Sequence, residues 1–492
     1  LVGSEMCIRD RCMKARALKE NILRKLGRVK EAEELHKESL KIDPLYDRQP
    51  EKINHNTLLE LVIDLYEAGD YAQGITLAEK WVEQKSAKGE NIYPLVYYYI
   101  AYGYDNLPGA EAAGPAEHYA ALGEKAVADG CFPHRTEDYI VLKRLAAEYD
   151  LGMAYYYLGC LLYDKRVYGE AVADYEKAAL KYPEFPTVHR NLALAYYNVK
   201  KQPQRAYEEL TRAFALDETD ARVYLELDQL KKRLNVPVKE RWSDMEKHFD
   251  LVESRDDLYL EYVTLLNTLG EPEKALGLIM VRKFHQWEGG EGKVAAQYLT
   301  ALYQLAKAAV AKEDYAEAKE LLLRAVDEYP HNLGEGKLES AQENNLYYLL
   351  GLAQEKLGET EEAFVNLTKA CYGESEPVGM MYYNDQPPEM IYYQGLAYRK
   401  LGDEEQAVQR FCKLVDYGKE HIGDEIKIDY FAVSLPDLLI FEEDLKERNR
   451  KHCLFMMSLG LKGLGRTDEA EKCAQQLLAM DNAHQGIRVH DL

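Results

Sequence analysis

The stretch YYYLGCLLYDKRVYGEAVADYEKAALKYP, residues 155–183, carries the pattern that decides the fold. Its small residues and its proline stand at steps of 12, 7 and 5 positions, at Gly159, Ala171, Ala178 and Pro183. The same steps recur in residues 302–330, and partial copies occupy residues 347–370 and 391–414. In these copies the repeated positions are Ala306, Ala318, Ala325, Pro330, Gly351, Ala363, Ala370, Gly395 and Ala407. Such spacing predicts a fold built from one small unit used many times.

Helix packing explains the steps. Each copy reads as two helices of about 12–15 residues joined by a short turn. A small residue in the first helix and another in the second let the two backbones approach closely, and a step of seven on one helix is two turns, so both alanines lie on one face. Aromatic residues such as Tyr175 and Phe411 are expected to fill the space beside them. The prolines end the second helix, because proline cannot continue it.

This unit resembles the tetratricopeptide repeat, which is about 34 residues long. Weaker copies keep only some of the small positions, such as Ala32, Gly74, Ala206, Ala213, Ala275 and Ala470. The resemblance implies an all-α fold, a right-handed α-solenoid of about ten to eleven helix pairs between about residue 13 and residue 484. Such an array grows in length without enlarging a central core.

The composition narrows the classes of partner. The net charge is −23 in 492 residues, so phosphate backbones and anionic membrane surfaces are repelled. No stretch of about 18 uncharged apolar residues predicts a membrane-spanning helix. The cysteines are scattered without a CxxC pair, so no metal site is expected, and no cofactor motif is present. We therefore expect neither nucleic acid nor membrane as a partner.

Three loops interrupt the repeat, at residues 284–294, 330–345 and 375–390. They divide the array into an N-terminal half, residues 12–284, and a C-terminal half with insertions, residues 285–492. Because stacked repeats present equivalent loops at one edge, we expect one composite patch. Its candidate residues are His285, Trp287, Glu288, Glu291, Lys293, His331, Glu335, Lys337, Tyr382, Tyr383, Asn384, Asp385 and Glu389.

Two interpretations of this patch stay open. In the first, aromatic rings, carboxylates and backbone N–H groups at a helix start bind a sugar or a protein. In the second, the loops only pack on each other between misaligned repeats. Glu288, Glu291 and Glu335 would be the candidates for acid–base chemistry on a glycosidic bond, which needs two carboxylates within reach. No catalytic residue is assigned.

Two further stretches break the helical period. Residues 129–142 predict a loop whose aromatic Phe132 is anchored under the next helix. Residues 426–445 mix β-branched and aromatic residues around Pro436 and predict a buried connector.

Several segments, among them CFPHRTED, FHQWEGGEGK and YYNDQPPEMIYYQGLA, resemble the repeat region of one bacterial family. Its members begin with a β-sandwich domain of unknown function (family five-one-zero-seven), similar to galactose-mutarotase-like folds. The resemblance implies a carbohydrate-related setting in the bacterial cytoplasm. Our first hypothesis is a non-catalytic scaffold that binds another protein, its own N-terminal domain or a sugar. The alternative is part of a carbohydrate-active enzyme whose site the β-sandwich completes.

The opening residues are expected to lie outside the native protein. LVGSEMCIRD lacks an initial Met and resembles a translated sequencing adapter, so residues 1–11 are set apart from the fold. On this interpretation a native N-terminal region precedes the repeats.

Overall fold

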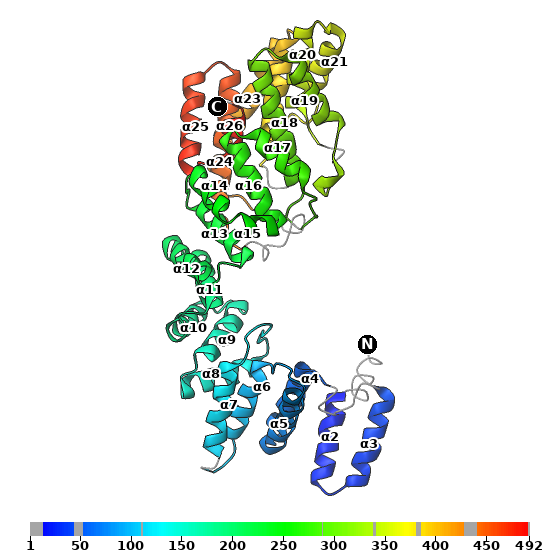
Figure 1. Cartoon of the computed structure of the whole chain (residues 1–492), viewed down its shortest axis with the longest axis vertical. Helices are drawn as coiled ribbons and strands as arrows, with labels where there is room; N and C mark the ends of the chain where they lie inside the picture. The colour runs from blue at the N-terminus through cyan, green and yellow to red at the C-terminus, as the bar shows by residue number, and fades with distance from the viewer. Residues whose placement is uncertain are drawn as a thin grey trace. The chain divides into compact units, whose positions relative to one another are not determined.

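The computed structural model describes residues 13–43, 53–109, 112–287, 289–337, 341–379, 385–427 and 440–490. Every element in this part of the chain is helical, as Figure 1 shows, and none is a β-strand. The first helices are α2 (Met13–Lys25), α3 (Val29–Ile42), α4 (His55–Glu67), α5 (Tyr71–Ala87), α6 (Pro94–Asp105), α7 (Ala113–Lys125), α8 (Thr136–Tyr149), α9 (Gly152–Asp164), α10 (Tyr168–Lys181) and α11 (Pro186–Asn198).

The remaining helices are α12 (Pro203–Leu216), α13 (Ala221–Arg233), α14 (Val238–Lys247), α15 (Phe249–Ser254), α16 (Asp256–Leu269), α17 (Pro272–Val281), α18 (Lys293–Ala311), α19 (Tyr315–Asp327), the 3₁₀ helix η2 (His331–Leu333), α20 (Asn344–Leu357), α21 (Thr360–Cys371), α22 (Pro388–Lys400), α23 (Glu404–His421), α24 (Leu445–Gly463), α25 (Thr467–Met480) and α26 (Gln485–Val489). The predicted all-α solenoid is confirmed by these helices, which pack in successive pairs such as α9 with α10, α18 with α19 and α22 with α23.

Turn chemistry separates the two helices of a pair. Gly402 has a φ of 89°, a left-handed conformation that favours glycine, and it follows the end of α22. Asp403 then caps α23, because its carboxylate accepts a hydrogen bond from the backbone N–H of Gln406 at 3.1 Å. Asp314 caps α19 in the same way, through the N–H of Glu317.

Close packing within a pair depends on the small residues. A Cβ added to Gly159 in α9 would lie 2.6 Å from Cδ1 of Tyr175 in α10, and one added to Gly395 in α22 would lie 2.5 Å from Cε1 of Phe411 in α23. Gly351 in α20 meets Leu367 in α21 in the same way, at 2.7 Å from Cγ. In each pair the touching residue stands one helical turn after the repeated alanine of the second helix.

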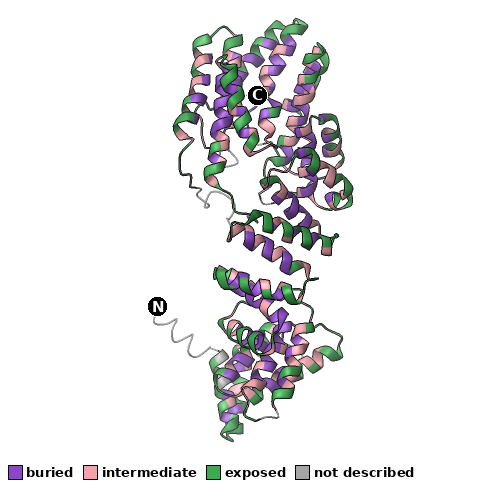
Figure 2. Cartoon of the chain, turned by 90° about the vertical axis from the view of Figure 1, so that its left-hand side faces the viewer, coloured by how far each residue is buried: buried purple, intermediate pink, exposed green. Residues whose placement is uncertain are grey.

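The repeated alanines are almost fully buried. None of them exposes more than 3% of its surface: Ala171, Ala178, Ala306, Ala318, Ala325, Ala363, Ala370 and Ala407. Figure 2 shows buried residues in nearly every helix rather than in one central core. The helices α10 and α19 end at Lys181 and Asp327, two and three residues before Pro183 and Pro330.

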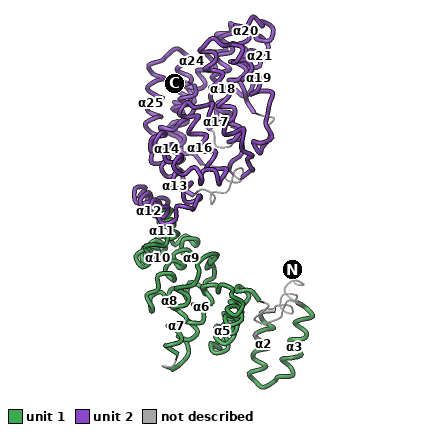
Figure 3. The backbone as a smooth tube through the Cα atoms, in the orientation of Figure 1, with its two compact units in different colours: residues 1–195 green, residues 196–492 purple. Residues whose placement is uncertain are grey.

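The chain divides into two compact units, residues 1–195 and 196–492 (Figure 3). The boundary predicted at residue 284 is marked by loop insertions rather than by compactness, and it stays a prediction. Within the described residues, no helix is both long enough and apolar enough to cross a membrane.

The second unit closes on itself. Residues 440–442, just before α24, reach back to α11 and α13: Nδ2 of Asn198 donates to the carbonyl of Ile440 at 2.9 Å, and Nη2 of Arg233 donates to the carbonyl of Phe441 at 3.1 Å. Farther along, the backbone N–H of Asn482 donates to Oδ1 of Asn235 at 2.7 Å. The last repeats of this unit therefore contact its first ones.

The structure gives different results for the two irregular stretches predicted at residues 129–142 and 426–445. Phe132 is 74% exposed, so the prediction that it is anchored under the next helix is wrong. The neighbouring Cys131 is buried instead, and Asp138 turns the chain into α8 by accepting hydrogen bonds from the N–H groups of His134 and Arg135. In the second stretch residues 428–439 lie outside the described residues, and Phe441 is 1% exposed.

Candidate functional site

The first two inserted loops pack against each other. The N–H of Phe284 donates to the carbonyl of Asn332 at 2.8 Å, and Nδ2 of Asn332 donates to the carbonyls of Ile279 and Arg282 at 2.8 and 3.0 Å. Gly334 lies so close that an added Cβ would stand 2.7 Å from the carbonyl oxygen of Phe284. These hydrogen bonds occupy backbone N–H and carbonyl groups of the two loops that a ligand could otherwise bind.

The N-terminus of α18 already holds an anion from the chain itself. Oε2 of Glu335 accepts from the N–H of Gly292 at 2.7 Å, and Oε1 accepts from the N–H of Ala295 at 3.2 Å. A carboxylate is stabilised there because the N–H groups of a first helical turn lack intrahelical acceptors. Glu335 thus joins the second loop to the helix that follows the first.

His285 and its neighbours form a salt-bridge cluster at the start of α16. Both the N–H and Nδ1 of His285 lie near Oδ2 of Asp256, at 2.9 and 3.1 Å, and Arg282 pairs with Oδ1 at 2.6 Å. Burial raises the pKa of the Asp256 carboxyl, but the hydrogen bonds from His285 and Arg282 outweigh it and the net pKa is lowered.

Trp287 and Lys293 lie at the exposed side of the first loop. The half-buried Trp287 ring covers Gly290, where an added Cβ would lie 2.3 Å from Cε2. Lys293 keeps contact with solvent, while the surrounding protein and the charge of Lys232 lower its pKa against the opposing charges of Glu261 and Glu291. Glu291 is exposed.

In the second loop, Lys337 pairs with Glu343 at 2.6 Å and donates to the carbonyl of Val326 at 3.1 Å, whereas His331 is exposed. The expected patch residues Glu288, Tyr382, Tyr383 and Asn384 lie outside the described residues.

The third loop contacts a different set of elements. Nε2 of His452 in α24 lies 2.8 Å from the carbonyl of Val378, and Lys413 in α23 pairs with Glu376. Asp385 and Glu389 are half-buried, and burial raises the pKa of Glu389 to about 7. The structure thus brings the first and second loops together, and the described part of the third loop lies against α23 and α24.

A buried ionic network stands beside the first loop, and sequence reasoning missed it. Arg241 in α14 is 1% exposed and donates to both carboxylate oxygens of Asp228 in α13, at 3.0 and 2.6 Å. It also donates to Glu261 in α16 at 2.7 Å, which Lys232 contacts at 3.0 Å. The available signal was Asp228 itself, a charged residue among the apolar positions of α13.

Sequence reasoning also missed a surface inside the second unit, which we call the inner wall. It is formed by Thr268 of α16, Gln297 and Lys307 of α18, Tyr393 of α22, and Phe455 and Lys462 of α24. Each of these helices is the first helix of its pair. Residues 481–490, here called the inner segment, contact this wall, and Figure 1 shows their helix α26 beside α16 and α24.

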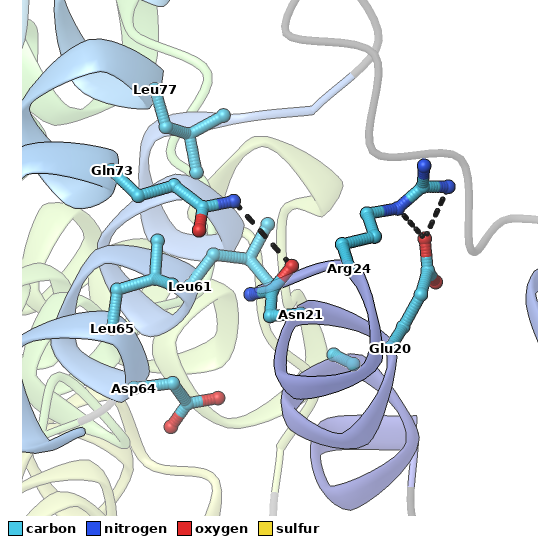
Figure 4. Close-up of a pocket in the computed structure, with 9 residues that line it drawn as sticks. Glu20, Asn21, Arg24, Leu61, Asp64, Leu65, Gln73 and Leu77 are labelled. Carbon is cyan, nitrogen blue, oxygen red and sulfur yellow. Dashed lines mark hydrogen bonds and ion pairs between the residues drawn. The ribbon is translucent and has the colours of Figure 1, made fainter. Parts of the chain in front are cut away.

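A small cavity of about 240 Å³ lies in the first unit between α2, α4 and α5 (Figure 4). Leu61, Leu65 and Leu77 form its apolar side, and Nε2 of Gln73 donates across it to Oδ1 of Asn21 at 3.5 Å. Arg24 and Glu20 pair at its rim at 3.2 Å. Its polar groups are thus largely occupied by one another. Among the described residues, no group of three or more His, Cys, Asp or Glu side chains is arranged to hold a metal ion.

Family models for the tetratricopeptide repeat match residues 156–221, 300–332, 345–372 and 389–417. The chain therefore contains tetratricopeptide repeats, and the matched residues cover the copies that define the spacing.

Several solved structures are similar at low identity. Yeast Tom70 is 12% identical, with 98% of this chain and 95% of that chain covered and a TM-score of 0.30. The APC/C hetero-tetramer Cut9–Hcn1 is 13% identical, with 96% and 88% covered and a TM-score of 0.23. The human IFIT1 dimer with PPP-AAAA is 14% identical, with 85% and 89% covered and a TM-score of 0.25. The assignment of the repeats rests on the family models and on the helix pairs.

Proposed function

We propose that the tetratricopeptide repeats of this chain form a non-catalytic scaffold, and that its inner wall binds a segment of another protein or of another domain of the same polypeptide. The supporting observation is that lysine side chains of the wall donate hydrogen bonds to backbone carbonyls of residues 489 and 490. Nζ of Lys307 donates to the backbone carbonyl of Val489 at 2.6 Å, and Nζ of Lys462 donates to that of His490 at 3.1 Å. Donors aimed at backbone carbonyls suit a polypeptide ligand.

The carbohydrate-related bacterial setting and the cytoplasmic location are part of this proposal and rest on the sequence resemblance. The enzyme alternative has less support. One of its three candidate carboxylates, Glu335, is already engaged by the N-terminus of α18. The packing of the first two loops supports the interpretation that the loop patch stabilises the repeats.

The test is a selection of 12-residue peptides from a random display library on the full chain, followed by affinity measurements on variants. Lys307→Glu is expected to lower the affinity of the chain for the selected peptides by about tenfold or more, because it places a carboxylate where a backbone carbonyl of the peptide must approach. The control is Lys312→Glu, the same charge change at the exposed end of α18. Peptides that bind both variants as tightly as the unchanged chain would contradict the proposal.

A further inference from the structure

The inner segment, residues 481–490, is held at several points along the wall. Its Gln485 forms a reciprocal amide pair with Gln297, at 3.1 Å in each direction. At its other end Nδ1 of His490 lies 3.0 Å from the hydroxyl of Tyr393, which in turn lies 2.5 Å from that of Tyr303. With the two lysine contacts to Val489 and His490, the segment meets α16, α18, α22 and α24.

Apolar burial adds to these polar contacts. Ile487 is 2% exposed and Val489 is 8% exposed, whereas Arg488 between them is exposed. The rings of His484 and Phe455 lie 4.8 Å apart, and Gly486 lies so close to Phe455 that an added Cβ would stand 2.6 Å from Cζ. The short helix α26 thus buries its two branched apolar side chains while Arg488 faces solvent.

A segment that merely ended the array would contact the last helix pair. The inner segment instead contacts helices from α16, which begins at Asp256, to α24, which ends at Gly463. Its Asn482 also forms a hydrogen bond with Asn235, which precedes all of these helices in the sequence. The contacts with α16, α18, α22 and α24 lie on the first helices of their pairs, on the same wall that the proposed function uses. The segment therefore occupies the surface that a partner would need.

We propose that the inner segment is an intramolecular ligand of the inner wall, and that a partner protein binds by displacing it with a segment of the same chemistry. The partner's segment carries an amide side chain followed by two branched apolar residues at alternate positions. Backbone carbonyls at its end accept hydrogen bonds from Lys307 and Lys462, as those of Val489 and His490 do. This inference rests on the proposed function. It adds that the wall is closed in the free protein, so the apparent affinity for a partner is reduced by the fraction of molecules that are open.

The experiment uses the full chain and a fluorescent synthetic peptide with the sequence of residues 480–490, MDNAHQGIRVH. Its affinity is measured by anisotropy for the unchanged chain, for Ile487→Asp and for Lys472→Ala. Ile487→Asp places a charge in an apolar site and releases the chain's own segment, so the peptide should bind at least about tenfold more tightly. Lys472→Ala changes an exposed residue of α25 outside the inner segment and the inner wall, and it should leave the affinity unchanged.

The outcomes separate the two proposals. Equal affinity for the unchanged chain and Ile487→Asp, with binding still lost in Lys307→Glu, would overturn displacement and keep the wall as the binding site. Binding that survives Lys307→Glu in every background would overturn the proposed function itself. Val489→Asp serves as a second releasing variant. If both releasing variants unfold, as measured by circular dichroism, the segment is part of the core and displacement is overturned.

Discussion

At the scale of single residues, the fold depends on where side-chain volume is absent. Ala171 is fully buried between α9 and α10, and Gly159 leaves room for the Tyr175 ring on the facing helix. Protein interiors are close-packed, so even one added methyl group is felt where no space exists. The same residue types elsewhere in these helices face open space, which provides internal controls.

Ala171→Leu and Ala363→Leu are each expected to lower the free energy of unfolding by about 1–3 kcal/mol, because the added atoms overpack the space between paired helices. The matched control is Ala173→Leu, at an exposed position of α10, which is expected to change stability by about 0.5 kcal/mol or less. Urea unfolding of the three variants checks this. No loss at either buried site would mean that the repeat register is wrong.

Two glycine-to-alanine substitutions give a second test, because they are expected to change the stability in opposite directions. Gly395→Ala should destabilise the second unit, since its Cβ would lie 2.5 Å from Phe411. Gly277→Ala should stabilise it by about 0.5–1 kcal/mol, because Gly277 lies inside α17, a Cβ added there would enter open space, and alanine favours helix. Thermal unfolding of both variants suffices, and equal shifts of the melting temperature would contradict the packing argument.

At the scale of elements, helix ends and loops account for most of the candidate patch. Glu335 satisfies the N-terminus of α18, Asn332 satisfies the carbonyls at the end of α17, and Asp256 joins His285 to the start of α16. Polar loop residues that looked available for a ligand are therefore used by neighbouring helices. Residue type alone does not distinguish these two uses.

Glu335→Ala is expected to lower the free energy of unfolding by about 0.5–2 kcal/mol, because it removes the acceptor for two N–H groups at the start of α18. Glu291→Ala is the control, an exposed carboxylate in the first loop. Hydrogen exchange should show faster exchange at Gly292 and Ala295 in Glu335→Ala only. Unchanged protection at these two amides would show that the cap does not form in solution.

Glu389 gives a pH-dependent prediction. Its folded pKa of about 7 lies above the ordinary value of 4.5, so the folded state binds a proton more tightly than the unfolded state. Its contribution is favourable below about 4.5 and is lost as the pH rises towards about 7. Glu389→Gln should therefore stabilise the chain by about 1–3 kcal/mol at pH 8 and have little effect at pH 4.

Chemical unfolding of Glu389→Gln at the two pH values measures this difference. Glu405→Gln, which removes an exposed carboxylate at the start of α23, is the control for the loss of one negative charge. A Glu389→Gln variant with the same stability difference at both pH values would contradict a raised pKa.

At the scale of the whole molecule, the second unit is closed by contacts between residues far apart in the sequence. Phe441 stacks edge-on against Tyr197 at 5.0 Å, and Arg233 lies over its ring. An open solenoid makes only neighbour contacts between repeats, so this closure should make the second unit unfold more cooperatively than a simple array.

Phe441→Ala is expected to cost about 3–5 kcal/mol, because it empties a fully buried site that joins the two ends of the unit. Phe364→Ala is the control, since Phe364 on α21 is 61% exposed. Hydrogen exchange of Phe441→Ala should lose protection together in α13 and α24. Loss confined to α24 would contradict closure.

The sequence by itself determined the repeated unit. Gly159, Ala171 and Ala178 stand at steps set by helix geometry, and turn signals such as Gly402–Asp403 act through adjacent residues, so both are visible locally. Only the tertiary structure decided how Glu335 is used, that Arg241 is buried among carboxylates, and that the inner segment lies on the inner wall. These arrangements join residues 13 to 247 positions apart, and the longest of them depend on small rotations accumulated over many repeats. No local pattern in one sequence encodes that sum.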